Sequence, residues 1–204
     1  MPRILALSGS PSPTSRTEAV VEQLAVRLRR QGHRVALAPI RELPAGALLS
    51  GDAEHPDIAA VADAISSADG LVVASPVYKA AYSGLLKSLL DLLPQFALDG
   101  KTVLPLATGG SLAHVLAIDY AFRPVLHSMG AEHVVQGYFL LDRLITVSEH
   151  GATVAPEAEP TLLSIVDSFS ETLHRRTRVV AASVRSHGVP SSSGSPARSH
   201  ISGI

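Results

Sequence analysis

Cysteine and tryptophan are absent from this chain of 204 residues, and aromatic residues make up only 4% of it. Without thiols the protein has no disulfide, thiolate metal site, iron–sulfur cluster or cysteine nucleophile, and we expect it to be cytoplasmic. The formal net charge is −1, so no excess of one sign of charge indicates a nucleic acid or an anionic membrane as partner.

Long apolar runs are also missing. No stretch approaches the roughly 20 residues of a membrane span, and Met1-Pro2-Arg3 leads into an apolar strand pattern rather than a signal peptide. No pair among the nine histidines has metal-ligand spacing beside a carboxylate, so we predict no metal site. What remains, with 46% hydrophobic residues, is typical of one globular domain with a sizeable core.

Short apolar runs alternate with helical patterns. We expect strands at Ile4–Leu7, Val35–Leu37, Leu71–Ala74, Val103–Ala107 and His133–Leu140. We expect helices at Thr17–Arg30, Asp57–Ala68, Leu85–Leu93, Ala113–Met129 and Thr161–Arg176, and a loop from Pro39 to Pro56. Apolar strands in this alternation predict a five-stranded parallel sheet with helices on both faces. About 180 residues and five strands favour an α/β, flavodoxin-like three-layer sandwich of strand order 2-1-3-4-5.

The composition changes from about Ser183 onward. The segment Ser191-Ser192-Ser193-Gly194-Ser195-Pro196 has too few apolar side chains to offset the entropy of ordering it. We therefore predict a folded domain over residues 1–178 and a disordered tail over residues 179–204.

A loop rich in hydroxyl groups connects the first strand to the first helix. A helix N-terminus offers unpaired N–H groups and a positive dipole, so such a loop suits an anion. Its spacing matches neither Gly-x-Gly-x-x-Gly nor a nucleotide triphosphate loop, which favours a phosphate monoester. The alternative is an ordinary capped turn, with Ser15 or Thr14 as the cap. The candidate phosphate ligands are Ser8, Ser10, Ser15, Arg16 and Thr17.

Two more loops follow the third and fourth strands, at the edge of the sheet where ligands bind in open α/β folds. One offers an aromatic side chain and backbone donors, and the other offers adjacent glycines that let backbone approach a flat ring such as an isoalloxazine. The ordinary alternatives are a core tyrosine, a solvated lysine, a cap or a simple turn. The candidate ligands are Pro76, Val77, Tyr78 and Lys79, then Thr108, Gly109, Gly110, Ser111 and His114.

The predicted helix Ala113–Met129 is apolar on more than one side and contains Pro124. Such a helix is either buried or faces another subunit. A helix that contains proline commonly has an irregularity such as a π-bulge. A kinked core helix and an oligomer interface are therefore both open interpretations.

Several of these segments together resemble the NADPH-dependent FMN reductase family, in particular the flavin reductases of two-component alkanesulfonate monooxygenases. The resemblance is carried by Ala74–Gly84, Leu89–Pro94, Leu104–Gly110, Ala113–Ala121 and Leu173–Arg176. It implies FMN bound by the three loops, a homotetramer, and a tyrosine at Tyr120 in a π-helical irregularity near the flavin. Ser12 stands where many relatives have a basic residue, which leaves Arg16 as the cation of the first loop.

The resulting functional prediction is reduction of FMN to FMNH2 by NADPH or NADH, with hydride passing to flavin N5 and the reduced flavin supplied to a monooxygenase. One alternative is an azo or quinone reductase that keeps its FMN bound, and another is a non-enzymatic flavodoxin. A 2′-phosphate on the dinucleotide requires basic residues, and the candidates are Arg16, Lys79 and Arg123.

Overall fold

A computed structural model describes residues 1–149 and 151–186 and contains a seven-stranded sheet. Its main strands are β1 (Arg3–Ser8), β2 (Arg34–Pro39), β3 (Gly70–Tyr78), β5 (Thr102–Gly109), β6 (His133–Val134) and β7 (Tyr138–Leu141). They are parallel, in the order β2-β1-β3-β5, and β6 and β7 both pair with β5. The predicted order 2-1-3-4-5 is confirmed, with a fifth strand that is broken in two.

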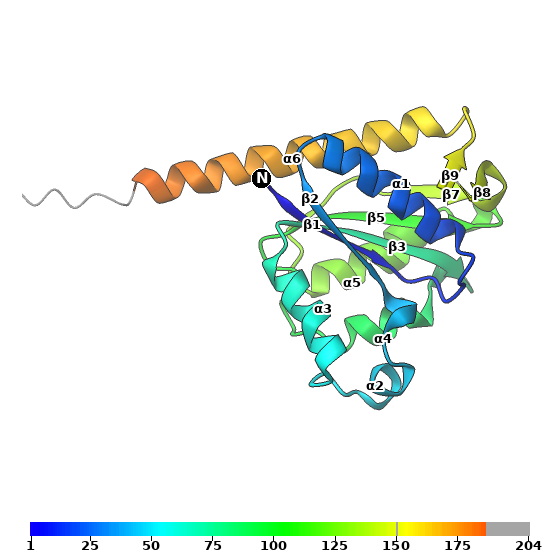
Figure 1. Cartoon of the computed structure of the whole chain (residues 1–204), viewed down its shortest axis with the longest axis horizontal. Coiled ribbons are helices and arrows are strands. Elements are labelled where there is room, and N and C mark those ends of the chain that lie inside the picture. The colour runs from blue at the N-terminus through cyan, green and yellow to red at the C-terminus, as the bar shows by residue number, and fades with distance from the viewer. Residues whose placement is uncertain (150, 187–204) are drawn as a thin grey trace, which may run out of the picture.

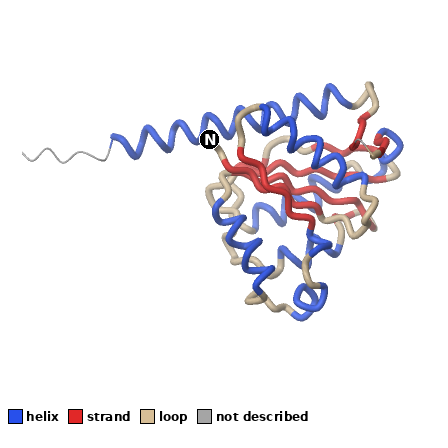
Figure 2. The backbone as a smooth tube through the Cα atoms, in the orientation of Figure 1, coloured by secondary structure: helices blue, strands red, loops and turns tan. Residues whose placement is uncertain are grey.

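Helices cover both faces of this sheet, as predicted. One face carries α1 (Arg16–Arg30) and α6 (Glu159–Ser186), and the other carries α3 (Pro56–Ser67), α4 (Gly84–Leu90) and α5 (Arg123–Ser128) (Figure 1). Figure 2 shows the strands as one twisted layer between these two sets of helices. Within the described ranges, no helix combines the length and apolarity needed to cross a membrane.

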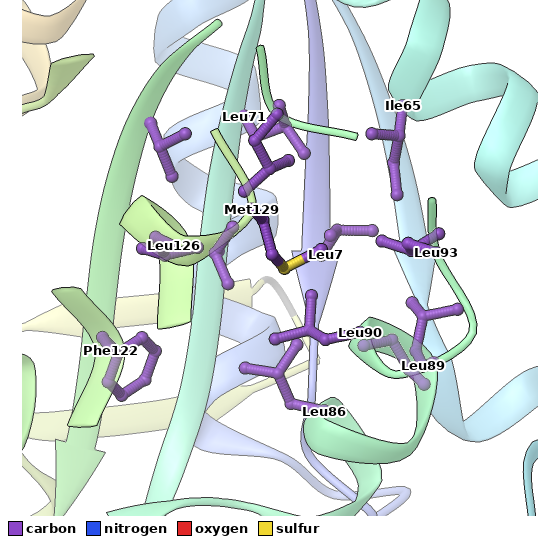
Figure 3. Close-up of a cluster of buried hydrophobic side chains, with 14 of the residues drawn as sticks. Leu7, Ile65, Leu71, Leu86, Leu89, Leu90, Leu93, Phe122, Leu126 and Met129 are labelled. Carbon is purple, nitrogen blue, oxygen red and sulfur yellow. The ribbon is translucent and has the colours of Figure 1, made fainter. Parts of the chain in front are cut away.

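Each face has its own hydrophobic core because the strands are apolar on both sides. Alternate residues of β1 divide between the cores: Leu5 and Leu7 pack toward α3 and α4, whereas Ile4 and Ala6 pack toward α1 and α6. Figure 3 shows side chains of β1, α3, α4 and α5 that converge in the first of these cores. Burial of Val/Leu/Ile/Phe side chains is worth about 1.5–3 kcal/mol each, so the two cores hold the loops at the sheet edge in place.

Two predicted segments have more structure than expected. The expected loop from Pro39 to Pro56 contains a short 3-10 helix, η1 (Ile40–Glu42), and helix α2 (Ala45–Ser50). The expected helix Ala113–Met129 is interrupted. It consists of η2 (Leu112–His114), a π-helix η3 (Ile118–Phe122) and α5. The predicted π-helical irregularity around Tyr120 is thus confirmed.

Two small β-structures were not predicted. Strand β4 (Ala81–Tyr82) folds back on β3, and β8 (Ile145–Ser148) pairs with β9 (Gly151–Val154) after the short η4 (Asp142–Leu144). Helix α6 extends ten residues beyond the expected end at Arg176, across the predicted domain boundary at residue 178, and projects past the sheet (Figure 1). The rest of the predicted tail, 187–204, lies outside the described residues, and the division into domain and tail stays a prediction.

Polar contacts between α1 and α6 hold the long helix against the domain. Arg27 donates two hydrogen bonds to Asp167, at 2.7 and 2.6 Å, and Gln31 donates a third at 2.6 Å. Just beyond α1, the buried His33 forms a 2.7 Å hydrogen bond through Nε2 with Ser170 on α6, and its ring lies 4.4 Å from that of His174. The Nδ1 atom of His33 has no partner in the described part of the chain.

We expect this histidine to make stability depend on pH. Burial, and then the nearby His174 and the chain N-terminus, lower the pKa of His33 from 6.5 to about 4, because a second proton on the ring would be poorly solvated. The unfolded chain therefore binds more protons between these values. The neutral His33 therefore contributes about 3 kcal/mol to the free energy of unfolding. This contribution is fully present above pH 6.5 and is lost as the pH falls toward 4. Denaturant unfolding at pH 7 and pH 4.5 measures it, and His33→Gln should show a smaller difference between the two pH values. If wild type and His33→Gln lose the same amount of unfolding free energy between pH 7 and pH 4.5, His33 is not the source of the pH dependence.

Candidate functional site

The loops that follow β1, β3 and β5 are joined by direct hydrogen bonds at the carboxyl edge of the sheet. The N–H of Gly9 donates to the carbonyl of Ala74 at 2.8 Å, and the hydroxyl of Ser83 donates to the carbonyl of Gly9 at 2.5 Å. The hydroxyls of Thr17 and Thr108 lie 2.7 Å apart. The structure therefore brings the three predicted loops together, as their position after parallel strands requires.

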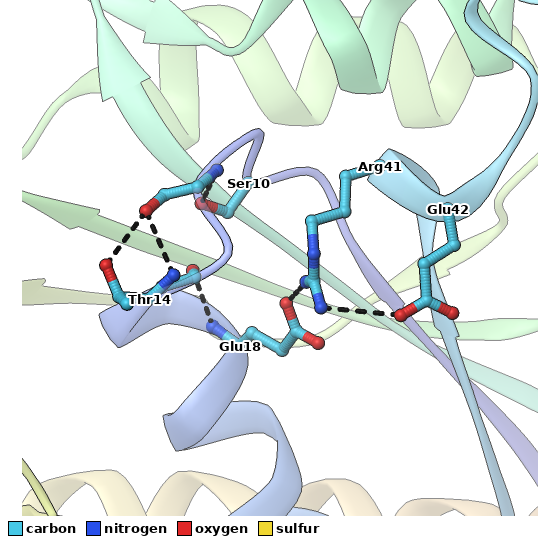
Figure 4. Close-up of polar contacts among 7 residues, drawn as sticks. Ser10, Thr14, Glu18, Arg41 and Glu42 are labelled. Atoms are coloured by element: carbon cyan, nitrogen blue, oxygen red, sulfur yellow. Dashed lines mark hydrogen bonds and ion pairs between the residues drawn. The ribbon is translucent and has the colours of Figure 1, made fainter.

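The first loop orients hydroxyl groups at the start of α1. Ser10 accepts a hydrogen bond from the N–H of Ser12, and Ser15 caps the helix by accepting from the N–H of Glu18 at 3.0 Å. Both hydroxyl oxygens accept from backbone N–H groups, and neither hydroxyl donates a hydrogen bond within the described part of the chain. Glu18 would repel an anion, but Arg41 from η1 pairs with it and also with Glu42 (Figure 4). The one charged residue between Gly9 and Thr17 is Arg16, so the loop itself offers an anion hydroxyl and backbone donors with one cation.

Ser8 does not join this set. It alternates with Leu7 along β1, and its buried hydroxyl lines a cavity of about 140 Å³ beneath α1, together with Glu18, Glu22 and Glu42. Three carboxyl groups make that cavity unsuitable for phosphate. Thr17 is as buried as Ser10, and its hydroxyl pairs with that of Thr108, so it joins two loops; this pair uses one of its two hydroxyl protons.

Arg16 begins α1 and is exposed, with no partner among the described residues. It lines a cavity of about 570 Å³ with Thr14 and with Ile145, Thr146 and Val147 of β8. This cavity contains no carboxylate, so the guanidinium is available to an anionic ligand. Arg16 was predicted from its position in the first loop, whereas the contribution of β8 was not predicted.

The second loop is a tight hairpin rather than an open loop. Strand β3 continues to Tyr78 and pairs with β4, and the two turn residues, Lys79 and Ala80, have φ values of 51° and 66°. This left-handed backbone is unfavourable for residues with a Cβ and fits a type I′ turn. Val77 is buried in the core, Pro76 is half-buried, and Tyr78 and Lys79 are exposed. Of the four predicted ligands, Tyr78 and Lys79 have the most accessible side chains.

Two serines that were not predicted as site residues connect this hairpin to the first loop. Ser75 accepts a hydrogen bond from the N–H of Ser83 at 2.8 Å and donates to the carbonyl of Pro76 at 2.9 Å. Ser83 caps α4 by accepting from the N–H of Leu86, while it donates to Gly9. A serine directly before a helix pattern indicates the cap, but its contact with Gly9, 74 residues away, has no signal in the sequence.

The third loop leaves open space beside its backbone. Gly109 is buried, and a Cβ on it would lie 3.0 Å from the ring of Phe139. A Cβ on Gly110 would meet only a carboxylate oxygen of Asp142, at 4.0 Å. Ser111 caps η2 by accepting from Ala113, and His114 is half-buried at the end of η2. The structure places all five predicted residues at one edge, with Gly110 and Ser111 facing solvent.

The π-helix lies next to this edge and carries exposed apolar side chains. Tyr120 is 79% exposed, and the preceding turns add Leu112, Val115 and Leu116, which are also exposed. On the opposite side of η3, the buried Phe122 packs edge-on against Tyr82 of the hairpin, with 5.3 Å between ring centroids. The π-helix is therefore in direct contact with the second loop.

Elsewhere in the described part of the chain, neither a metal-binding group nor a cavity offers a better candidate for the functional site. No group of three or more histidine, aspartate or glutamate side chains there could hold a metal ion. A cavity of about 740 Å³ lies between α1, β9 and α6, but none of the predicted site residues lines it. We place the candidate site at the sheet edge because three loops of complementary chemistry meet there.

Comparison with known proteins identifies the family. The model of the NADPH-dependent FMN reductase family matches residues 2–144. An FMN reductase (NADPH) of Escherichia coli (strain K12) is 40% identical over 174 residues, which cover 85% of this chain and 91% of that protein. The NADH-dependent FMN reductase SfnF of Pseudomonas fluorescens (strain Pf0-1) is 41% identical over 127 residues, 60% of this chain and 67% of that protein.

The solved apo structure of an NADH:FMN oxidoreductase (EMOB) has a TM-score of 0.77 and 44% identity, and the match covers 84% of this chain and 90% of that one. The family match extends from β1 through η4, and so includes the three loops and the π-helix. These findings confirm the resemblance drawn from the sequence. The chain belongs to the NADPH-dependent FMN reductase family.

Proposed function

We propose that this protein reduces FMN with NADPH or NADH and releases FMNH2 to a partner monooxygenase of the alkanesulfonate type. The balanced reaction is NAD(P)H + H⁺ + FMN → NAD(P)⁺ + FMNH2. The observation that carries the proposal is that hydrogen bonds join the three loops at one edge of the sheet. Gly9 bonds to Ala74 and Ser83, and Thr17 bonds to Thr108.

The residues at this edge fit FMN. Ser10 and Ser15 have hydroxyl protons to donate to a phosphate, and each charge-assisted hydrogen bond is worth about 1.5–3 kcal/mol. Gly110 leaves the space that a flat ring requires, and Tyr78 offers an aromatic wall. When bound, FMN supplies the ring that accepts a hydride from the reduced nicotinamide.

The protein's own contribution is binding and orientation. We assign phosphate binding to Ser10 and Ser15, ring contact to Tyr78 and Lys79, and backbone contact to Pro76, Val77 and the segment from Thr108 to Ser111. N–H groups of the third loop aimed at the ring would stabilise the negative charge that reduction creates. The fixed loops also align the two rings before hydride transfer. No side-chain acid is required at the accepting nitrogen. His114 and Tyr120 border this site.

Partner, oligomer and location follow as further parts of the proposal. The exposed apolar side chains of Leu112, Val115, Leu116 and Tyr120 support self-association through residues 112–120, as a homotetramer or a dimer. The names of relatives divide between NADPH and NADH. Arg123 donates to two backbone carbonyls of the fold, which leaves Arg16 and Lys79 as candidates for binding a 2′-phosphate.

The absence of cysteine supports the cytoplasm as the location of the protein.

A spectrum and a steady-state assay test the function. We expect the purified protein to be colourless or weakly yellow and to oxidise NADPH or NADH only when FMN is added, with saturable dependence on FMN. Loose binding is expected because the site is open at the sheet edge. The same assay with riboflavin, which lacks the phosphate, should show a KM at least about tenfold higher, a loss of about 1.4 kcal/mol of binding.

Each alternative has its own result. A strongly yellow protein that turns over a quinone or azo dye without saturable dependence on FMN would identify a reductase with bound cofactor. Failure to oxidise either dinucleotide at any flavin concentration would favour a flavodoxin-type carrier. The near-neutral net charge of −1 already differs from the strongly acidic surfaces typical of such carriers.

A further inference from the structure

Proline at position 105 interrupts the hydrogen-bond ladder of a central strand. Pro105 lies in the middle of β5, in register with Val73 of β3 on one side. Proline has no N–H, so it is normally excluded from central strands. On the other side, the fifth strand breaks into β6 and β7, and residues 135–137 lie between them.

The missing bond can be assigned from the register. Val135 donates its N–H to the carbonyl of Val103 at 2.9 Å. In a parallel ladder every second residue of a strand bonds to the same neighbour. The next donor along β5 would thus be residue 105, and its acceptor would be the carbonyl of Val135. Because residue 105 is proline, that carbonyl needs another donor.

Arg123 supplies this donor. Its guanidinium extends from the junction of η3 and α5 and donates to the carbonyls of Val134 at 3.0 Å and Val135 at 3.1 Å. Its Nε atom donates to Asp119 within the π-helix at 2.9 Å. The side chain is 27% exposed. One arginine thus binds both the π-helix and the broken strand.

A glycine completes the contact between the same elements. A Cβ on Gly137 would lie 2.8 Å from the carbonyl oxygen of Pro105 and 2.8 Å from Ile118 of η3, closer than real Cβ atoms come. Only glycine therefore lets the π-helix lie directly on the strand break. Since a π-helix is rarely stable by itself, contacts of this kind hold η3 in its register.

We propose that Arg123 is a positioning residue: by replacing the backbone donor that Pro105 lacks, it fixes the π-helix on the sheet. Through Phe122 and Tyr82, η3 then supports the hairpin that carries Tyr78 and Lys79. The consequence for flavin binding rests on the proposed function. An exposed ion pair with Asp119 alone would contribute little, so the two carbonyl bonds carry the effect.

The test compares four variants with wild type. They are Arg123→Gln, Pro105→Val, Asp119→Asn and the double variant that combines Arg123→Gln with Pro105→Val. We expect Arg123→Gln to raise the KM for FMN about tenfold with kcat changed less than about threefold, because binding geometry is lost rather than chemistry. Pro105→Val supplies the missing N–H, so the Arg123→Gln change should cost less than about threefold in that background. Asp119→Asn should have a smaller effect than Arg123→Gln. Lys87→Gln, which removes the exposed i,i+4 ion pair between Lys87 on α4 and Asp91 just after this helix, is the matched control and should have no effect.

Amide hydrogen exchange gives a readout that does not depend on catalysis. We expect Arg123→Gln to accelerate exchange in residues 118–123 and 134–139, and Pro105→Val to reverse this. If exchange is unchanged in Arg123→Gln, or if Pro105→Val does not reverse the change, then Arg123 does not replace the backbone hydrogen bond that Pro105 cannot make, and the proposal is overturned. Accelerated exchange with an unchanged KM overturns the positioning role. An equal effect of Asp119→Asn assigns the role to the ion pair and also overturns the proposal. If wild type reduces no FMN, the proposed function fails while exchange still tests the role of Arg123.

Discussion

Replacement of Gly110 with valine is expected to raise the KM for FMN by at least about 100-fold, a loss of about 2.7 kcal/mol in binding. Gly110 is exposed, its φ lies outside the left-handed region, and a Cβ would have no atom nearer than Asp142 at 4.0 Å. The free protein therefore accommodates the larger side chain. A flat ring lying on the third loop does not, because the added methyl groups occupy its place.

Steady-state kinetics with varied FMN, together with flavin fluorescence titration, measure this effect. Gly46→Val in α2 is the matched control, since Gly46 is also exposed and has no atom within 4 Å of its added Cβ. Thermal unfolding should give similar melting temperatures for both variants and wild type. If Gly110→Val reduces FMN with a wild-type KM, the third loop does not contact the flavin and our site is misplaced.

Removal of the Ser83 hydroxyl is expected to cost about 2–4 kcal/mol of unfolding free energy, because it removes the cap of α4 and leaves the buried carbonyl of Gly9 without its donor. The first loop is tied to the hairpin by this bond. Ser83→Ala should therefore also raise the KM for FMN about tenfold, while a pure stability effect would leave KM unchanged.

Urea unfolding and FMN kinetics at a temperature where both proteins are folded separate the two effects. Ser83→Thr keeps the hydroxyl and should recover most of the stability. Ser88→Ala on α4 is a suitable control, because its hydroxyl donates only to Leu85 within the same helix. A Ser83→Ala protein with less than about 1 kcal/mol of destabilisation would show that the contact between the loops is weak.

Several features of the fold follow from local pattern alone. Apolar runs such as Leu71–Ala74 predict buried parallel strands, and Ser15 followed by Glu18 predicts the start of α1, because caps and strand periodicity are short-range effects. Their alternation predicts the strand order, and the strand order places three loops at one edge. Pro124 in a helix that is apolar on several sides predicts an irregularity, which the π-helix confirms.

Other features require contacts between distant residues. Ser8 looks like a member of the hydroxyl loop, but the alternation of β1 turns it beneath α1, toward Glu22 and Glu42. Arg123 looks like a free cation for a 2′-phosphate, yet it is bound to the strand break opposite Pro105. The hairpin at Lys79 and Ala80 has none of the usual glycines, so no turn signal marks it.

Periodicity and contiguous motifs therefore predict the layers, the strand order, the resemblance to flavin reductases and the edge at which we propose that the ligand binds. Which side chains face that edge depends on packing in the folded chain. Packing directs Thr17 to Thr108 and Ser83 to Gly9, and it directs Arg123 to the carbonyl that Pro105 cannot satisfy. Buried polar groups must find partners, and only the folded chain shows which partners lie within reach.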